Sequence, residues 1–244
     1  MKKIFRKMAV FILSWQAQFY IKKFKPEIIL VFGQINRSNI KEEIVKDLAD
    51  NKYKVRGNLK GYNSEIGVPL SILNLQAGFS SVFKWLKLFF NGFNKLLFKK
   101  IKSNDIKEIL VLEVTINNLK DIRYLFKFKQ PNIVIFSDFD ANFSKKSQES
   151  VKGLIGFWVR GSAIILNEDL LLSELELPKN KIYKFGLSDK SLIRAYNLQQ
   201  IENGQKFKFN VNGEEGQANL NKFGVHAVWS YLISRFASNY YKKI

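Results

Sequence analysis

A short loop between an apolar run and a helical pattern is the part of this sequence best suited to binding phosphate. Residues 27–32 (EIILVF) form a nearly continuous apolar run, typical of a buried parallel strand, and Gly33 follows at once. The apolar residues after that point have helical spacing: Ile40, Ile44, Val45 and Leu48. Residues 33–38 therefore form a strand-to-helix turn, where backbone N–H groups can wrap round a phosphate.

The histidine and cysteine content limits the chemistry further. The chain has one histidine, His226, and no cysteine, which excludes a disulfide scaffold, a thiolate metal site and a cysteine nucleophile. The lack of cysteine fits a reducing compartment, and we expect a cytoplasmic protein. A lone histidine has two interpretations, structural packing and contact with a ligand, and both stay open at this point.

The balance of charge indicates an anionic partner. The formal net charge is +19, which attracts nucleic acid, lipid head groups or a phosphorylated substrate. The excess has a second interpretation, because Lys, Ile, Asn and Phe are abundant throughout the sequence and a uniform bias says nothing about a site. Nucleic acid is the least suitable partner, because the aromatic side chains lie in apolar helical stripes and not on an open strand face where bases stack.

The elements that position the loop predict an α/β fold. Four further apolar runs predict strands, namely residues 108–114, 132–136, 161–167 and 182–185. A helical pattern lies between the first two, and strand–helix–strand order indicates a parallel sheet. Residues 206–211 begin a polar antiparallel hairpin, and residues 226–240 have helical spacing. We therefore expect one domain over residues 26–244, with a mostly parallel sheet flanked by helices.

Two segments predict basic amphipathic helices. Residues 1–25 have lysines at both ends of an apolar stretch that is shorter than the ~20 residues a spanning helix needs, and no cleavage site follows. Residues 79–102 carry an apolar stripe at three- and four-residue spacing with lysines between: Phe79, Phe83, Leu86, Phe90, Phe93 and Leu97. A core helix is the ordinary interpretation of such a stripe, but its dense phenylalanines also favour a membrane surface or a partner protein.

Seven collinear motifs resemble the central, nucleotide-binding domain of Mur ligases. The most specific, residues 61–70 (GYNSEIGVPL), is similar to N-Y-N-T-E-I-G-V-P-L of the D-alanyl-D-alanine-adding branch, MurF. Residues 33–38 (GQINRS) correspond to the family loop G-x-x-G-K-[ST]. The others follow in the family's order, at residues 111–122, 163–169, 185–189, 193–197 and 224–232. The resemblance implies a P-loop-type domain, ATP as the nucleotide and a place in peptidoglycan biosynthesis.

The resemblance implies that Gly33, Asn36, Arg37 and Ser38 bind ATP, through a Walker A loop that departs from the family twice. Asn36 replaces a glycine; it tolerates a left-handed backbone better than most residues but brings a side chain toward the nucleotide. Arg37 replaces the lysine; it keeps the charge, but its planar fork follows a transferred phosphoryl group less well than a compact ammonium. We therefore expect catalysis to be damaged before binding.

The family's metal and catalytic residues are partly kept. Ser38 and Glu113 correspond to ligands of Mg²⁺, and Arg37 and Glu113 are the catalytic candidates that the resemblance implies. The family's second metal ligand, a histidine, corresponds to Asn142. We therefore expect a weakened metal site.

Two further groups of residues correspond to binding positions of the family. Four lie in the motif at residues 61–70 and are expected to bind substrate: Tyr62, Asn63, Ser64 and Glu65. Three correspond to positions near the nucleotide base: Asn167, Asp169 and His226. For His226 the resemblance gives a nucleotide contact the same weight as structural packing.

Mur ligases phosphorylate a carboxylate with ATP and then let an amine attack the acyl phosphate, and they use three domains to do so. About 25 residues precede the first strand here, and the sequence ends where the family's C-terminal module begins. We therefore expect a divergent MurF-like central domain, a pseudoenzyme that binds ATP and a peptidoglycan precursor but does not complete the ligation alone.

Two alternative functions stay open. The first is an active ATP-dependent, peptide-bond-forming ligase whose missing module comes from a partner protein. The second is a non-enzymatic scaffold, peripheral on the inner face of the membrane, that docks on anionic lipid through the two basic helices.

Overall fold

The computed structural model describes residues 3–33, 35–76, 81–98, 107–115, 123–137, 145–158, 161–168 and 182–242. The helices in these parts are α1 (Lys3–Phe24), α2 (Arg37–Asp50), α3 (Gly67–Leu73), α4 (Val82–Phe98), α6 (Lys145–Trp158) and α7 (Val225–Lys242). The strands are β1 (Glu27–Phe32), β2 (Val55–Gly57), β3 (Ile109–Val114), β4 (Ile133–Phe136), β5 (Ala163–Asn167), β6 (Ile182–Gly186), β7 (Ile193–Ile201), β8 (Gly204–Val211) and β9 (Glu214–Leu220).

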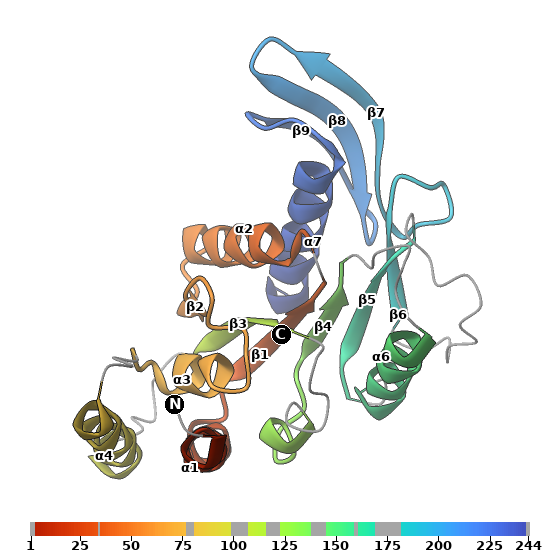
Figure 1. Ribbon diagram of the computed structural model, residues 1–244. Helices are drawn as coiled ribbons and strands as arrows, with labels where there is room; N and C mark the ends of the chain where they lie inside the picture. Colours follow the sequence, from red (N-terminus) through yellow and green to blue (C-terminus); the bar gives the residue numbers. More distant parts are fainter. Residues whose placement is uncertain are drawn as a thin grey trace.

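All these strands form one mixed sheet, which extends from a parallel half into an antiparallel half (Figure 1). Their order is β2-β3-β1-β4-β5-β6-β7-β8-β9. Pairing is parallel from β2 to β7, whereas β7, β8 and β9 pair antiparallel. The predicted fold class is confirmed, including the antiparallel hairpin near the C-terminus.

Helices cover both faces of the parallel half, which is why its strands read as continuous apolar runs. In β1, Ile28, Leu30 and Phe32 face a core shared with α1, α3, α4 and α6. The alternate residues Ile29 and Val31 face a second core, which α2 and α7 close. The alternation of side chains along a strand thus divides the interior into two layers.

Helix α1 is packed into the first of these cores. Its residues Ala9, Leu13, Ala17 and Ile21 are fully buried there, and α1 contacts both α3 and α4. The predicted basic helix is therefore part of the packed domain. In the parts of the chain that the structure describes, no helix combines the length and apolarity required to cross a membrane.

The structure differs from the expectation for residues 79–102 in the face that the helix buries. Helix α4 buries Trp85, Leu88, Phe89, Gly92 and Leu96, whereas the described members of the predicted stripe, residues 83, 86, 90, 93 and 97, are exposed. Phe79 lies outside the described residues. A core role for the stripe is therefore wrong.

Candidate nucleotide-binding site

The loop after β1 opens at the carboxyl edge of the parallel strands. Phe32, the last residue of β1, pairs in register with Val114 of β3 and with Phe136 of β4. Helix α2 begins at Arg37, so its N-terminus and Gly33 lie at this edge (Figure 1). The N–H groups of a helix N-terminus carry partial positive charge, and this position therefore suits a phosphate.

The buried carboxylate of Glu113, near the end of β3, gathers the polar side chains of this edge. Arg37 Nε donates to Oε1 at 2.9 Å, and Ser38 Oγ donates to Oε2 at 2.8 Å. Asn63 Nδ2 also donates to Oε1, at 2.9 Å, while Lys41 Nζ lies 3.7 Å from Oε2. The Glu113 side chain is only 4% exposed, so four donors enclose it.

These neighbours keep Glu113 ionised. Burial by itself raises the pKa of a carboxyl group, but hydrogen bonds from Asn63, Ser38 and Arg37, with the charge of Lys41, hold the pKa of Glu113 below its ordinary value. Two cations around one anion leave an excess of positive charge. That excess favours an anionic ligand beside the loop.

The donor set does not fit Mg²⁺ in this arrangement. Both oxygens of Glu113 already accept from protein donors, and the Arg37 guanidinium also donates through Nη1 to the Gly33 carbonyl oxygen at 2.6 Å. A divalent cation on this carboxylate would be repelled by the positive charge of the Arg37 guanidinium. Among the described residues no three His, Asp or Glu gather as metal ligands, and Asn142 lies outside them. Metal binding by Ser38 and Glu113 stays a prediction that requires Arg37 to move.

Asn58, Lys41 and Thr115 support the site and were missed by the sequence analysis. Asn58 accepts from the Glu113 backbone N–H and donates to the Glu113 carbonyl oxygen, both at 2.9 Å. Lys41 Nζ donates to the Asn58 carbonyl oxygen at 3.0 Å, and Thr115 Oγ1 donates to that of Asn63 at 2.6 Å. Of these three residues, only Lys41 could have been found from the sequence. It follows Arg37 by four residues, one helical turn, and therefore lies on the same face of the helix.

Asn36 is turned away from the loop. Contrary to the expectation that its side chain would approach the nucleotide, that side chain is fully buried against α7. Nδ2 donates to the His226 carbonyl oxygen at 3.0 Å and to Ser230 Oγ at 3.3 Å. The Asn36 backbone has a φ of −98°, so the left-handed conformation is not used. Any contribution of Asn36 to phosphate binding would come from its backbone.

The side chains of the four predicted substrate residues contact different parts of the domain. Asn63 is at the Glu113 centre, but Ser64 Oγ accepts from the N–H of Gly67 at 3.3 Å, where α3 begins. Glu65 forms an ion pair with Arg6 of α1 at 2.7 Å. Tyr62 packs against the first core. The structure therefore brings one of the four residues to the candidate site, and their role in substrate binding stays a prediction.

Of the residues expected near the nucleotide base, Asn167 and His226 are described, and both contact other parts of the domain. Asn167, at the end of β5, donates through Nδ2 to the Ser137 carbonyl oxygen at 2.8 Å and so joins the ends of β4 and β5. The His226 ring lies edge-on to Trp229, with ring centroids 5.0 Å apart. Its Nδ1 has no hydrogen-bond partner among the described residues, and Asp169 lies outside them. Contact of these residues with a base stays a prediction.

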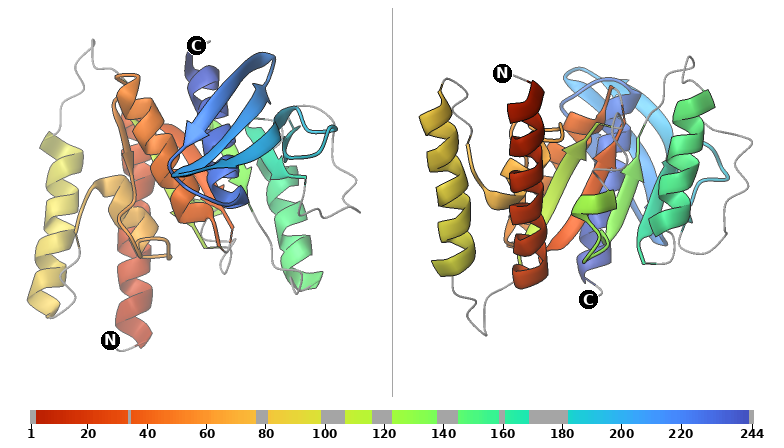
Figure 2. Two further views of the ribbon diagram at one scale, coloured as in Figure 1. Left: turned by 90° about the horizontal axis from the view of Figure 1, so that it is seen from above. Right: turned by 60° about the horizontal axis from the view of Figure 1, so that its bottom comes forward.

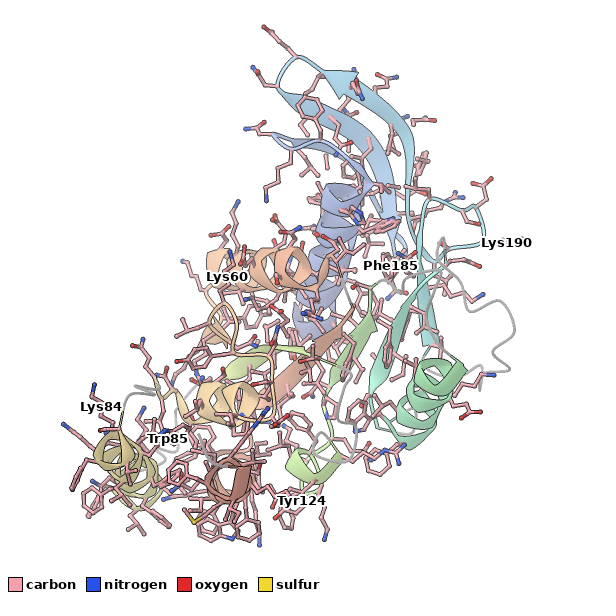
Figure 3. The ribbon with its side chains drawn as sticks, viewed as in Figure 1. Lys60, Lys84, Trp85, Tyr124, Phe185 and Lys190 are labelled. Atoms are coloured by element: carbon pink, nitrogen blue, oxygen red, sulfur yellow. The ribbon has the colours of Figure 1, made fainter. Side chains whose placement is uncertain are left out.

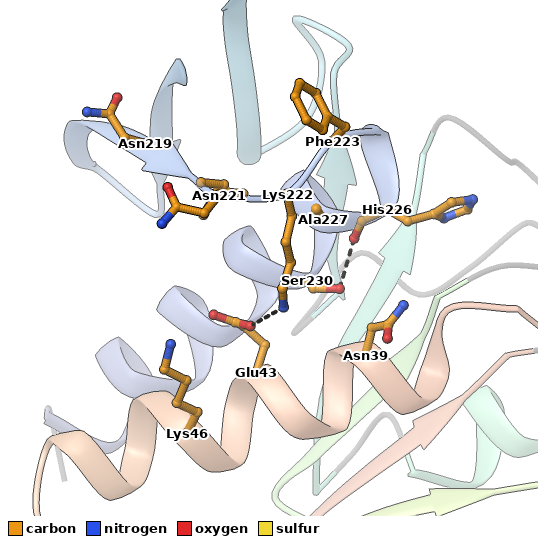
Figure 4. A pocket seen from close by; sticks show the side chains of 11 residues that line it. Asn39, Glu43, Lys46, Asn219, Asn221, Lys222, Phe223, His226, Ala227 and Ser230 are labelled. Carbon is orange, nitrogen blue, oxygen red and sulfur yellow. Dashed lines mark hydrogen bonds and ion pairs between the residues drawn. The ribbon is translucent and has the colours of Figure 1, made fainter. Parts of the chain in front are cut away.

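A groove of about 510 Å³ lies between α2, the end of β9 and the start of α7 (Figure 4). Lys222 Nζ pairs with Glu43 across it at 3.5 Å. His226 contributes to the lining, but its ring points away from that pair in Figure 4. The groove lining includes none of Arg37, Ser38 or Glu113. It is therefore a feature separate from the Glu113 centre.

Comparison with known proteins finds similarity to Mur ligases. No family model matches the chain. It is 24% identical, over 84% of its length, to 40% of the UDP-N-acetylmuramoyl-tripeptide--D-alanyl-D-alanine ligase of Buchnera aphidicola. It is 30% identical, over 42% of its length, to 24% of the UDP-N-acetylmuramate--L-alanine ligase of a Sulfurihydrogenibium species. The chain thus spans two fifths or less of these curated relatives.

A solved structure extends the likeness to the whole fold. The MurF ligase of Thermotoga maritima, in complex with ADP, superposes with a TM-score of 0.69 at 18% identity, over 96% of this chain and 49% of that one. The fold is therefore that of a Mur ligase central domain. The resemblance to the MurF branch that the motifs indicated is confirmed.

Proposed function

We propose that this chain, with its Mur ligase central fold, is a nucleotide-binding domain of the MurF type that binds ATP or ADP at the N-terminus of α2. The observation that carries the proposal is the position of Arg37, which bridges the Gly33 carbonyl oxygen of the loop and the Glu113 carboxylate of β3. A cation at this point neutralises phosphate oxygens beside the loop. The ADP complex of the Thermotoga protein, which has the same fold, supports this assignment.

Ligation places a stronger demand on the site than binding does. A guanidinium held by two protein acceptors is not placed to follow a phosphoryl group as it moves to a carboxylate. We propose that the chain by itself binds nucleotide without completing peptide-bond formation. Its ligand class is that of the precursor ligases it resembles, a nucleotide together with a peptidoglycan precursor.

The test is calorimetric titration of the chain with a non-hydrolysable ATP analogue. We expect a dissociation constant in the micromolar range, which corresponds to a binding free energy of about −8 kcal/mol. Arg37→Ala should lower the affinity by about tenfold or more, since a charge-assisted hydrogen bond contributes about 1.5–3 kcal/mol. Lys107→Ala is the control, because Lys107 is 72% exposed and pairs with Glu27 at the start of β1, the end opposite the loop. Absence of binding, or an equal loss in both variants, would reject the proposal.

A second candidate function is ATP-dependent ligation in combination with further Mur ligase modules. It is favoured by the collection of Ser38, Asn63 and Glu113 in one centre. Release of phosphate from ATP that requires both an added ligase module and an acceptor amine would support it. Phosphate release that stays at the background rate under those conditions would leave binding as the function.

A further inference from the structure

Helix α1 is apolar on two faces, and it also buries polar side chains. Its polar residues Ser14, Gln16 and Gln18 are buried, with at most 5% exposure. Gln16 Nε2 donates to the Phe89 carbonyl oxygen of α4 at 2.9 Å. The outward stripe, at three- and four-residue spacing, is instead apolar and consists of Ile4, Met8, Phe11, Trp15 and Phe19, between 42% and 82% exposed. Exposure of such a stripe to water is unfavourable, because the transfer of large apolar side chains out of water lowers the free energy.

Helix α4 has the same feature, since it is apolar on two faces. One face packs on the domain through Trp85, Leu88 and Phe89. The other, again at three- and four-residue spacing, is directed outward and consists of Phe83, Leu86, Phe90, Phe93 and Leu97, between 40% and 82% exposed. A helix that needed only to complete a core would carry polar residues on this second face.

The two outward stripes join into one surface. Trp15 of α1 and Phe93 of α4 lie with ring centroids 5.7 Å apart, and the two helices run side by side on one side of the sheet (Figure 2). We call the ten residues of the two stripes the apolar face. Tyr124, which lies beside α1 in Figure 3, and Phe128 are also exposed, at 40% and 53%.

Charge on the same helices has one sign. The sequences of α1 and α4 contain lysine and arginine but no aspartate or glutamate. Arg6 is paired with Glu65, whereas Lys22 lies over the Phe128 ring, 5.3 Å from its centroid, at the border of the apolar face. Apolar side chains bordered by cations match a bilayer surface with anionic lipid. The acyl chains contact the apolar side chains, and the anionic head groups pair with the cations.

We propose that the apolar face docks on an anionic lipid bilayer, with α1 and α4 lying in the plane of the interface. The mode is peripheral, since no described helix could cross the membrane. Trp15 stands on the face as an interfacial residue, because an indole ring prefers the head-group region. The proposal does not depend on nucleotide binding, because the candidate nucleotide site around Glu113 includes none of the ten residues of the apolar face.

Trp15 supplies a direct readout. The chain has four tryptophans, of which Trp15 is 42% exposed whereas Trp85, Trp158 and Trp229 are at most 4% exposed. We expect vesicles of equal parts phosphatidylglycerol and phosphatidylcholine to sediment the chain and to shift its tryptophan emission to the blue. Phosphatidylcholine vesicles should do neither. Salt at 1 M, which shortens the Debye length to about 3 Å, should weaken the binding.

Paired substitutions test the face itself. Phe11→Asp together with Phe90→Asp should lower the partition constant by about tenfold or more, since each places a carboxylate at the interface. Phe223→Asp, at a residue 59% exposed near the start of α7, is the control for each single variant, Phe11→Asp or Phe90→Asp, and should bind as the parent does. Both proteins must keep the parent's circular dichroism spectrum, and the single variants replace the pair if it does not fold.

Three results would overturn the proposal. One is the absence of sedimentation with anionic vesicles, and another is equal binding by the parent and the paired variant. The third is a dimer in sedimentation equilibrium that the paired variant abolishes while vesicles bind neither protein, which would assign the apolar face to a second copy of the chain.

Discussion

The guanidinium of Arg37 lies on the carboxylate of Glu113, with Nε 2.9 Å from Oε1, and joins the start of α2 to the end of β3. The two residues are 76 positions apart in sequence. Their side chains are 20% and 4% exposed, so the contact is largely shielded from solvent. We therefore expect stability and nucleotide binding to depend on the same pair.

Removal of Arg37 should destabilise the fold as well as weaken binding. Arg37→Ala leaves a buried carboxylate with fewer donors, and we expect a loss of about 1–3 kcal/mol in the free energy of unfolding. Urea denaturation measures it. Arg194→Ala, which breaks an exposed pair, should change that free energy by less than about 1 kcal/mol. Equal losses in the two variants would contradict the importance of the Glu113 contact.

Acid should weaken the fold through Glu113. The pKa of Glu113 is lower in the folded chain than its ordinary value of 4.5, so the unfolded chain binds the proton more readily. The stabilisation is complete above the unfolded pKa and is lost as the pH falls through the folded pKa. Urea midpoints measured from pH 7 to pH 3 should decline less steeply below about 4.5 in Glu113→Gln than in the parent. Parallel curves would refute this contribution.

Magnesium should matter only after Arg37 is gone. In the parent, the guanidinium already neutralises Glu113, so the affinity for an ATP analogue should change by less than about threefold between EDTA and Mg²⁺. In Arg37→Ala, the oxygens of Ser38 and Glu113 become available as ligands for a cation. Mg²⁺ should then increase the remaining affinity for the ATP analogue. Calorimetry under both conditions checks this, and strong Mg²⁺ dependence in the parent would show that Arg37 leaves Glu113 when nucleotide binds.

Asn36 should contribute to stability more than to binding. Asn36→Ala removes donors to the His226 carbonyl oxygen and to Ser230, and we expect a loss of about 1–3 kcal/mol in the free energy of unfolding. Affinity for the ATP analogue, measured well below the melting temperature, should stay within about threefold of the parent, a difference under about 1 kcal/mol. A large loss of affinity in a folded variant would instead indicate that the Asn36 side chain contacts the nucleotide.

Gly67 should not tolerate a side chain. A Cβ atom at this position would lie 2.5 Å from the backbone of Tyr62, so Gly67→Ala must displace the segment that carries Asn63. We expect a loss of about 1–3 kcal/mol by overpacking. Gly156→Ala in α6 is the control, since its Cβ would meet nothing within 4 Å and alanine favours helix by about 1 kcal/mol. Thermal melts of both variants should therefore move in opposite directions.

The buried strands were predictable because both of their faces are covered. Continuous apolar runs indicated β1, β3, β4 and β5 and hence the parallel sheet. Strand β7 was missed because its second half is polar and exposed, and pairs only with β8. Helix α3 was missed because it has seven residues and contains Pro69. Its stability comes from complete burial, which local sequence does not encode.

The site was predictable by residue type but not by contact. Motif resemblance selected Arg37, Ser38, Asn63 and Glu113, and the structure brings these four together. The motif resemblance could not indicate that Arg37 would form an ion pair with Glu113, since both residues were expected to contact a ligand. The direction of the Asn36 side chain depends on a helix 190 residues later, and no local rule foresees such a partner.

The bond from Asn36 to α7 has a mechanical consequence. Strand β9 leads into α7 through residues 221–224, and the first turn of α7 carries the carbonyl oxygen that holds Asn36. The antiparallel extension and the loop that begins at Gly33 are thus connected by one strand, one helix and the two hydrogen bonds of Asn36 Nδ2. We therefore expect a displacement of the antiparallel extension to reach Asn36 through the first turn of α7.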